Sequence, residues 1–527
     1  MRLGIDFGTT RVVVALVDRG NFPLVSFEAP DGQAHDWFPP VAAVNGEARL
    51  YGWEAIAAQE DENWTVLRSL KRSLRSANPH TLVAVAGQQI PLRQLMAEMM
   101  MALKAQLLEH SNLGAESGGA DGGAAEEKLE VMLGVPANAN SNQRFLTEEA
   151  AQAAGFTVLG LLNEPSAAAI EFAHRNSAER KSRVGSGLVV YDLGGGTFDV
   201  SLVTLGETEH TVEASDGIPS LGGDDFDEIL AALVLESLSA SLGEDVRLKP
   251  QERYRLLEEC REKKESLNPN TRRVTLDLDR VRAGWEQVTI PVDDYYERCR
   301  PLIERTRAVV DNLLAAHAER TLDTLYVTGG AAELPPVARI LRESFGRKVR
   351  RSAYMRSASA IGLAIRAAVL SGDLPGQSTG DVQDQFNRNF GIWRETDSGG
   401  TIYFDLIFPR GVQLPAPGEE PLRIERIYTP AHNIGHFRYL ESSQLDEHGQ
   451  PKGEIANWDQ ILFPFDPALQ QVADLSAVPV TLLADPDNLG DLRIREEYTC
   501  DSAGSLRVKI HAEPSGYMRE YTIAQSA

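Results

Sequence analysis

Cysteine is scarce in this chain, and its spacing follows no pattern. Only three of the 527 residues are cysteine, namely Cys260, Cys299 and Cys500, and no two of them form a C-x-x-C pair. An odd number of widely separated thiols argues against a disulfide framework and against a structural zinc site. We therefore expect a protein of a reducing compartment.

Positive charge is also in short supply. Lys and Arg total 52 against 76 Asp and Glu, which gives a formal net charge of −24. Such a surface repels nucleic acid and anionic lipid, and no run of 18 uncharged apolar residues exists to span a bilayer. The chain enters Leu3-Gly4-Ile5-Asp6 without the basic and apolar regions of a signal peptide. We expect a cytoplasmic protein with neither a nucleic-acid nor a membrane partner.

The motifs of two common nucleotide-binding folds are missing. No Lys directly follows a Gly anywhere in the chain, which excludes the P-loop. Neither of the pairs Gly185/Gly187 and Gly194/Gly196 continues to G-x-G-x-x-G. P-loop hydrolysis and Rossmann dinucleotide binding are therefore poor fits.

The sequence does contain two regions of different pattern. Up to about Asp373, short β-branched runs alternate with amphipathic segments, which is typical of α/β layers. Leu374 to Asp384 lacks apolar periodicity and predicts a linker. Beyond it, runs such as Thr401 to Phe408, Leu422 to Tyr428 and Val478 to Leu483, together with a meander up to Ile523, predict a β-sandwich. We expect an α/β domain over 1–373, a linker over 374–390 and a β-sandwich over 391–527.

The strongest signal is a degenerate internal repeat. Ile5-Asp6-Phe7-Gly8-Thr9-Thr10 and Tyr191-Asp192-Leu193-Gly194-Gly195-Gly196-Thr197-Phe198-Asp199 each place an Asp at a strand end, then a Gly turn, then Thr. The repetition indicates two related lobes facing a cleft. Gly turns let backbone N–H groups approach phosphate oxygens, Thr hydroxyls donate further hydrogen bonds, and a carboxylate from each lobe can hold Mg²⁺. The expected ligand is a nucleotide polyphosphate.

Each of these features has a purely structural explanation when it is taken alone. A single Gly loop is an ordinary hairpin turn capped by Asp. Lys71, with arginines around it, has the pattern of a solvated basic helix face, and Glu164 before Pro165 is a favourable helix start. The two loops together favour the nucleotide site over these alternatives.

Combined, the motifs resemble the DnaK-type heat-shock-protein-70 chaperones of the actin-like ATPase superfamily over nearly the whole chain. The further markers are Leu70-Lys71-Arg72, Val135-Pro136-Ala137, Asn163-Glu164-Pro165-Ser166-Ala167-Ala168-Ala169, Leu221-Gly222-Gly223-Asp224-Asp225-Phe226-Asp227 and Val327-Thr328-Gly329-Gly330. The resemblance implies an α/β fold, a duplicated actin-like ATPase domain with two lobes around a nucleotide cleft, followed by a peptide-binding-like β-sandwich. Because the chain stops soon after the last expected strand, we expect a divergent member without the helical lid.

The resemblance also implies roles for individual residues. Asp6 and Asp192 look like the two Mg²⁺-organising carboxylates, and Lys71 is similar to the lysine that positions the attacking water. The implied catalytic residues are Lys71, Glu164, Asp192, Thr197 and Asp199. The implied nucleotide-binding residues are Gly8, Thr9, Thr10, Gly194, Gly195, Gly196, Thr197, Gly222, Gly223, Lys264, Gly329, Gly330 and Arg356.

The chain departs from the family on the adenine side of the site. Ala331 and Glu333 stand where the family usually has a Ser and a base-stacking Arg, and Glu265 replaces a common basic residue. Arg356 stands where an Asp is usual. We therefore expect Arg356 to stack on the base in place of residue 333.

The function implied by the resemblance is that of an ATPase chaperone in protein folding and the stress response. It would bind ATP or ADP with Mg²⁺ and couple hydrolysis to the binding of client proteins or extended apolar peptides. Further partners would be a nucleotide-exchange factor and a specialised J-domain co-chaperone, or none, because Gly160 replaces a basic residue near the expected docking region. Two alternatives stay open: a nucleotide-gated scaffold with little hydrolysis, and a small-molecule kinase of the same superfold.

Overall fold

The computed structural model describes the chain except for residues 114–127, 177–184, 207–208, 375–380, 397–400, 417, 482–491 and 523–527. Packing divides the chain into two units. Unit 1 comprises Met1–Arg75, His80–Asn138 and Thr147–Val382, and unit 2 comprises Ser76–Pro79, Ala139–Leu146 and Gln383–Ala527. Part of the expected linker, residues 375–380, lies outside the described residues, and the strand β19 (Asp381–Gln383) follows it.

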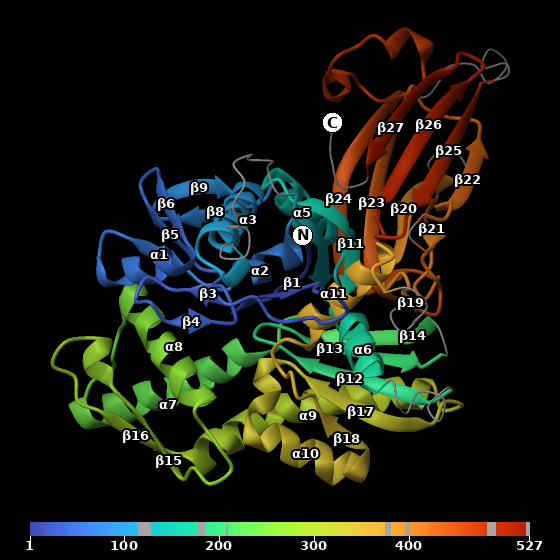
Figure 1. The fold of residues 1–527 in the computed structure, drawn as a ribbon. Coiled ribbons are helices and arrows are strands. Elements are labelled where there is room, and N and C mark those ends of the chain that lie inside the picture. Colours follow the sequence, from blue (N-terminus) through green and yellow to red (C-terminus); the bar gives the residue numbers. More distant parts are fainter. Residues whose placement is uncertain are drawn as a thin grey trace, which may run out of the picture. The chain divides into compact units, whose positions relative to one another are not determined.

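Unit 1 contains two large sheets of related topology (Figure 1). Their strand orders are β11-β10-β1-β2 and β18-β17-β12-β13-β14-β19. In each sheet an antiparallel hairpin, β1–β2 or β12–β13, is extended from its first strand by two parallel strands. The duplication predicted from the repeated loops is therefore confirmed, and the fold is that of an actin-like ATPase. We call residues 1–175 of unit 1 lobe I and residues 187–370 lobe II.

The large sheets use strands of ordinary length. Lobe I contributes β1 (Arg2–Phe7), β2 (Val12–Leu16), β10 (Glu130–Val135) and β11 (Thr157–Asn163). Lobe II contributes β12 (Gly187–Leu193), β13 (Phe198–Thr204), β14 (Glu209–Ile218), β17 (Leu322–Thr328) and β18 (Val349–Arg351). Shorter sheets are formed by β3 (Phe27–Glu28), β4 (Ala34–His35), β5 (Ala42–Asn45), β6 (Ala48–Tyr51), β7 (Thr65–Leu67), β8 (Leu82–Val85), β9 (Gln88–Pro91), β15 (Arg273–Leu276) and β16 (Val288–Pro291).

The helices begin and end where local chemistry favours it. Helix α6 starts at Glu164 with Pro165 in its first turn, where Pro loses no helical hydrogen bond and an acid meets the positive helix end. Helix α7 ends at Gly243, which adopts a left-handed conformation with φ of 75°. The described helices are α1 (Gly52–Ala57), α2 (Leu70–Ser73), α3 (Leu92–Glu109), α5 (Ser141–Ala153), α6 (Glu164–Arg175), α7 (Gly223–Leu242), α8 (Pro250–Glu265), α9 (Val292–Ala316), α10 (Pro335–Phe345) and α11 (Ala358–Leu370).

Helices α6 and α11 join the two lobes at a close crossing. One apolar core contains Ala167 of α6, Leu363 of α11 and strand residues of both lobes, such as Val13 and Val190. At Gly362 of α11 an added Cβ would lie 1.8 Å from the carbonyl oxygen of Ala167. The two helices therefore meet backbone against backbone, which only glycine permits at this point.

Unit 2 is built mainly from a β-sandwich, as the alternating pattern predicted. One sheet has the order β21-β20-β23-β24 and the other β22-β25-β26-β27. Buried aromatic residues such as Phe390, Tyr439, Phe463 and Tyr498 lie in its core. The strands are β20 (Asn389–Thr396), β21 (Thr401–Phe408), β22 (Leu422–Tyr428), β23 (Ile434–Leu445), β24 (Pro451–Pro464), β25 (Arg493–Cys500), β26 (Leu506–Glu513) and β27 (Tyr517–Thr522), and the predicted bounds of β21 and β22 are confirmed. The prediction of a strand at Val478 to Leu483 is wrong for its described part, residues 478–481, where Pro479 has no N–H group to donate to a neighbouring strand.

A buried ion-pair network connects the two sheets of the sandwich. Arg394 of β20 donates to both carboxylate oxygens of Glu496 on β25, over 3.1 and 2.6 Å. Its Nε also donates to Asp405 over 2.7 Å, and Tyr428 donates to Glu496 over 2.6 Å. Burial lowers the pKa of Arg394, but Glu496 outweighs it and raises that pKa overall. Arg394 is therefore a charged residue paired inside the sandwich.

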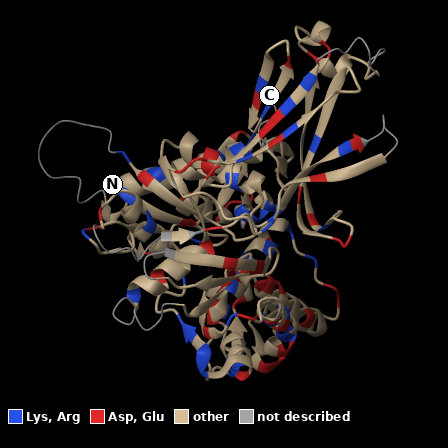
Figure 2. Cartoon of the chain, turned by 90° about the vertical axis from the view of Figure 1, so that its right-hand side faces the viewer, with Lys and Arg blue, Asp and Glu red and all other residues tan. Residues whose placement is uncertain are grey.

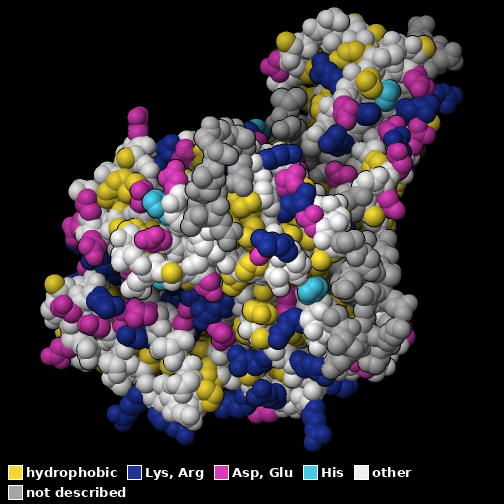
Figure 3. All heavy atoms as spheres, viewed as in Figure 1, with side chains coloured by type: hydrophobic (Ala, Val, Ile, Leu, Met, Phe, Trp, Pro, Cys, Tyr) yellow, Lys and Arg dark blue, Asp and Glu magenta, His cyan; other side chains and the backbone are white. Residues whose placement is uncertain are grey.

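Charges of both signs are spread over the described surface. Figure 2 shows acidic and basic residues interspersed along the strands of the sandwich and the helices of unit 1. The visible face in Figure 3 likewise mixes Lys and Arg with Asp and Glu. Among the described residues, no helix has the length and apolar character needed to cross a membrane.

Arg394→Ala should destabilise unit 2 strongly because it leaves the Glu496 carboxylate buried without its main partner. Loss of one member of a buried pair typically costs about 3–5 kcal/mol, whereas an apolar replacement of both members is close to neutral. Urea unfolding followed by tryptophan fluorescence should show that loss for Arg394→Ala, and near-recovery for Arg394→Met combined with Glu496→Met. Equal losses in both variants would show that the pair itself stabilises the sandwich.

Candidate active site

Most of the predicted site residues line one cavity between the lobes of unit 1. We call this cavity, of about 100 Å³, the inner cavity. The predicted residues that line it are Asp6, Gly8, Thr9, Thr10, Lys71, Glu164, Asp192, Gly194, Gly195, Thr197, Gly223, Lys264, Gly329, Gly330 and Arg356. Gly196, Gly222 and Asp199 do not line it but lie directly behind residues that do.

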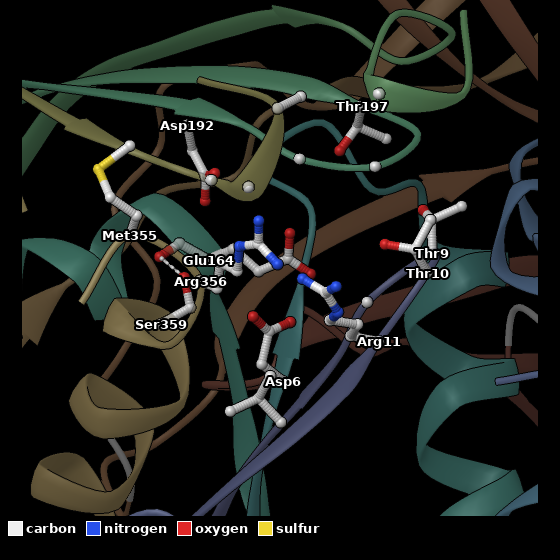
Figure 4. A pocket seen from close by; sticks show the side chains of 18 of the residues that line it. Asp6, Thr9, Thr10, Arg11, Glu164, Asp192, Thr197, Met355, Arg356 and Ser359 are labelled. Atoms are coloured by element: carbon white, nitrogen blue, oxygen red, sulfur yellow. Dashed lines mark hydrogen bonds between the residues drawn. The ribbon is translucent and has the colours of Figure 1, made fainter. Parts of the chain in front are cut away.

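The two aspartates occupy equivalent places in the two sheets. Asp6 and Asp192 are each the last residue but one of the first hairpin strand, β1 or β12. Figure 4 shows their carboxylates pointing into the cavity from opposite sides, with Thr9, Thr10 and Thr197 also around it. Asp199 on β13 stands opposite Asp192 in the strand register and is buried. The fold thus brings the two distant repeats to one place.

Glycine is required where the loops of the two lobes meet. A Cβ added to Gly195 would lie 2.8 Å from the side chain of Thr10, and one added to Gly222 would lie 2.6 Å from the backbone of Gly195. Gly329 has φ of 88°, and a Cβ there would lie 2.5 Å from the Asp192 carboxylate. Any side chain at these positions would force the loops apart.

Lys71 and Glu164 form a buried ion pair at the cavity. The Lys71 Nζ on α2 lies 2.5 Å from Oε1 of Glu164, the first residue of α6. Burial lowers the pKa of Lys71, but Glu164 and Asp6 outweigh burial and raise the pKa overall. Lys71 is therefore a fixed positive charge and not part of a solvated helix face. Glu164 is both the first residue of α6 and a residue that lines the inner cavity.

The carboxylates of the cavity carry more negative charge than Lys71 can balance. Burial first, and then the nearby Glu164 charge, raise the pKa of Asp6 to about 7 and that of Asp199 to about 7. Burial, Glu164 and Asp6 raise the pKa of Asp192 well above its usual value. These like charges repel one another because they lie close together in a buried place.

This donor set fits Mg²⁺ bound together with a phosphate ligand. Mg²⁺ prefers oxygen donors and is usually held by one or two carboxylates, substrate phosphates and water. Among the described residues, no group of three or more His, Cys, Asp or Glu side chains could form an all-protein metal site. Asp6 and Asp192 supply the two carboxylates, so the remaining donors would have to come from ligand and solvent.

Lys264 is held by a residue that sequence reasoning quoted only as part of a motif. Its Nζ lies 2.7 Å from Oδ1 of Asp227 and donates to the carbonyl oxygen of Gly223 over 2.8 Å. Burial raises the pKa of Asp227 to about 6, although Lys264 and Arg68 lower it. Asp227 therefore positions Lys264 at the edge of the inner cavity.

On the expected adenine side, two carboxylates hold Arg356 in place. Its Nη1 donates to Glu265 over 2.9 Å and its Nε donates to Glu333 over 2.6 Å. The guanidinium edge is thus occupied, while the residue still lines the cavity. Sequence reasoning missed Arg11, which also lines the cavity and bonds to Glu265. Its one sequence signal was its place directly after Thr9-Thr10.

Sequence comparisons relate this chain to known proteins. The family described as Hsp70 protein matches residues 2–384. A "Chaperone protein HscA homolog" of Laribacter hongkongensis is 30% identical over 549 residues, covering 100% of this chain and 78% of that protein. One of Methylibium petroleiphilum is 32% identical over 540 residues, covering 99% and 78%. The "Chaperone protein HscA" of Klebsiella pneumoniae is 33% identical over 436 residues, covering 78% and 64%.

Asp6→Asn should stabilise unit 1 at high pH when no ligand is added. A carboxyl whose pKa is raised in the folded state favours folding below its unfolded pKa, and this contribution is lost as pH rises through the folded pKa of about 7. Between pH 5 and 8.5, in EDTA, the wild-type melting temperature should therefore fall more steeply than that of Asp6→Asn. The gain at pH 8.5 should be on the order of 1 kcal/mol.

Asp294→Asn is the matched control, since Asp294 is an exposed acid on α9. It should keep the wild-type slope. A parallel pH dependence of Asp6→Asn and the wild type would show that the Asp6 carboxyl is not destabilised in the cleft.

Proposed function

Because this chain belongs to the Hsp70 family, we propose that it is an ATP-hydrolysing chaperone whose nucleotide site is the inner cavity. One observation carries the proposal. The Lys71–Glu164 pair, the Asp6 and Asp192 carboxylates and the glycine loops of both lobes all line the same cavity. A phosphate chain needs this combination of backbone donors, a fixed cation and carboxylates for a metal ion.

Lys71 would stabilise the transferred phosphoryl group and orient the attacking water. Its ammonium is fixed by Glu164 and kept charged, so it needs little reorganisation when charge develops on the phosphate oxygens. Glu164 acts through Lys71 and is a positioning residue. Thr197, on the turn before β13, would donate its hydroxyl to the terminal phosphate. No covalent nucleophile is required for this reaction.

Mg²⁺ would be held by Asp6 and Asp192, directly or through water. When bound, it neutralises charge on the phosphate oxygens and lowers the repulsion among the carboxylates. The backbone of Gly194 and Gly195 would receive the phosphates, since both residues line the inner cavity and Gly195 leaves no room for a side chain. Asp199, behind Asp192, would orient water through its contact with Thr197.

Arg356 would form one wall of the nucleobase site. Its hydrogen-bonding edge is engaged by Glu265 and Glu333, so its flat faces remain for stacking on a base. Lys264, fixed by Asp227, would contact the ribose. Arg356→Ala should therefore reduce the affinity for adenine nucleotides.

The β-sandwich of unit 2 would bind extended client segments, with domain bounds at about 1–373 and 391–527. The relatives named as chaperones support this role. A scaffold that binds one partner regardless of nucleotide is the competing function.

Lys71→Ala should retain Mg·ATP binding but hydrolyse ATP about 10²- to 10³-fold more slowly, because a preorganised charge-stabilising group is lost. Single-turnover hydrolysis with radiolabelled ATP, alongside calorimetric binding, measures both. Arg75→Ala, an exposed residue just after α2, is the matched control and should keep the wild-type rate. Unchanged turnover in Lys71→Ala would remove Lys71 from the mechanism.

ATP should accelerate release of a bound peptide if the two units are coupled as in a chaperone. A fluorescent apolar heptapeptide is bound to the purified chain, and its dissociation is followed after addition of Mg·ATP, Mg·ADP or buffer. We expect at least about tenfold faster release with ATP, equivalent to a dissociation barrier that is lower by about 1.4 kcal/mol. Binding of a single partner protein with no response to nucleotide would instead identify a scaffold.

A further inference from the structure

Two neighbouring cavities in unit 1 share the same boundary residues. The inner cavity measures about 100 Å³, and an outer cavity of about 760 Å³ lies next to it. Arg11, Arg261 and Glu265 line both. These three residues therefore form a boundary between the two cavities.

That boundary is an ion pair between the two lobes. Nη2 of Arg11, in the turn between β1 and β2, lies 2.5 Å from Oε2 of Glu265, the last residue of α8. The Arg11 guanidinium also lies over the Trp37 ring, 5.0 Å from its centroid. Arg11 is thus held between a carboxylate of lobe II and an aromatic ring of lobe I.

Arg11 is the cation best placed to change partners. It directly follows the Thr9-Thr10 loop, and Figure 4 shows its guanidinium pointing into the inner cavity on the side of Asp6. Lys71 is bound by the buried Glu164 and Lys264 by the buried Asp227. Glu265, by contrast, is part-exposed and is shared with Arg356. Burial lowers the pKa of Arg11 although Glu265 raises it, so Glu265 compensates the desolvation of Arg11 only in part.

We propose that Arg11 is a nucleotide-binding residue that exchanges Glu265 for the phosphate chain of the ligand. When Arg11 leaves Glu265, the boundary between the two cavities opens. The guanidinium then forms charge-assisted hydrogen bonds to phosphate oxygens, for which its planar fork is well suited. Glu265 consequently competes with the nucleotide for Arg11. This inference rests on the proposed function, because it requires the inner cavity to bind a nucleotide.

The competition predicts opposite effects for the two partners. Arg11→Gln should weaken Mg·ADP binding about tenfold or more, which is the loss of a hydrogen bond to a charged group. Glu265→Gln should strengthen it, by roughly threefold to tenfold, because the guanidinium no longer has to leave a carboxylate. If Arg11 only linked the two lobes and did not bind the ligand, Arg11→Gln and Glu265→Gln would change the affinity for Mg·ADP in the same direction.

A double-mutant cycle measured by isothermal titration calorimetry with Mg·ADP tests the proposal. Combining both changes should remove the gain from Glu265→Gln, which separates the effect of Arg11 from the release of Arg356. Glu236→Gln and Arg298→Gln remove the same charges at an exposed ion pair between α7 and α9 that lines neither cavity, and are matched controls with unchanged affinity. A gain that persists without Arg11, or affinities unaffected by Arg11→Gln, would overturn the proposal.

Tryptophan emission provides a second measurement that does not depend on the Glu265 variant. Departure of Arg11 from Trp37 should change the emission of the wild type on addition of Mg·ADP, and this change should vanish in Trp37→Phe and in Arg11→Gln. An identical change in all three proteins would contradict the exchange. Wild-type protein that binds no Mg·ADP would overturn the proposed function itself, and with it this inference.

Discussion

The packing of four carboxylates around a single ammonium group is the constraint that the rest of unit 1 has to satisfy. Asp6, Glu164, Asp192 and Asp199 crowd near Lys71, and burial first, then the repulsion of neighbouring carboxylates, raises the pKa values of the three aspartates. A cluster of this kind opposes folding, so the surrounding structure has to hold it together. Two sheets of duplicated topology, a shared apolar core and glycine loops without room for side chains provide that support. Strain of this kind is typical of functional sites.

The opposite wall of the cleft balances its charges in a different way. There, arginines and glutamates alternate, and Glu265 serves Arg11 and Arg356 at once while Glu333 holds the far edge of Arg356. The carboxylate side is left short of cations, whereas the opposite wall is internally neutralised. A ligand that brought a divalent cation to the first wall and a flat, uncharged face to the second would match both. The difference between the two walls would fix which end of an elongated ligand faces each of them.

Sequence reasoning reached the features that local chemistry encodes. The Asp-Gly-Thr repeats predicted the paired hairpins, and two strand-like runs predicted β21 and β22 to the residue, whereas a third run, at Val478, does not form a strand at residues 478–481. The partners of charged residues could not be predicted from the sequence, because the fold and not the sequence spacing brings Arg11 to Glu265 and Lys264 to Asp227. Arg394 is an example. It lies on the same strand face as the buried Ile392, but an arginine is ordinarily expected to face solvent. Only the fold reveals Glu496 on the other sheet, the buried partner of Arg394.

The crossing of α6 and α11 bears on how the cleft can open. Because Gly362 rests on the backbone of Ala167, no side chains interlock at that point. Interlocked side chains resist rotation, whereas smooth backbone surfaces allow small turns with little loss of packing. The crossing is therefore a place about which the two lobes can rotate. A bulky residue at position 362 would push α6 and α11 apart and so change the angle between lobe I and lobe II.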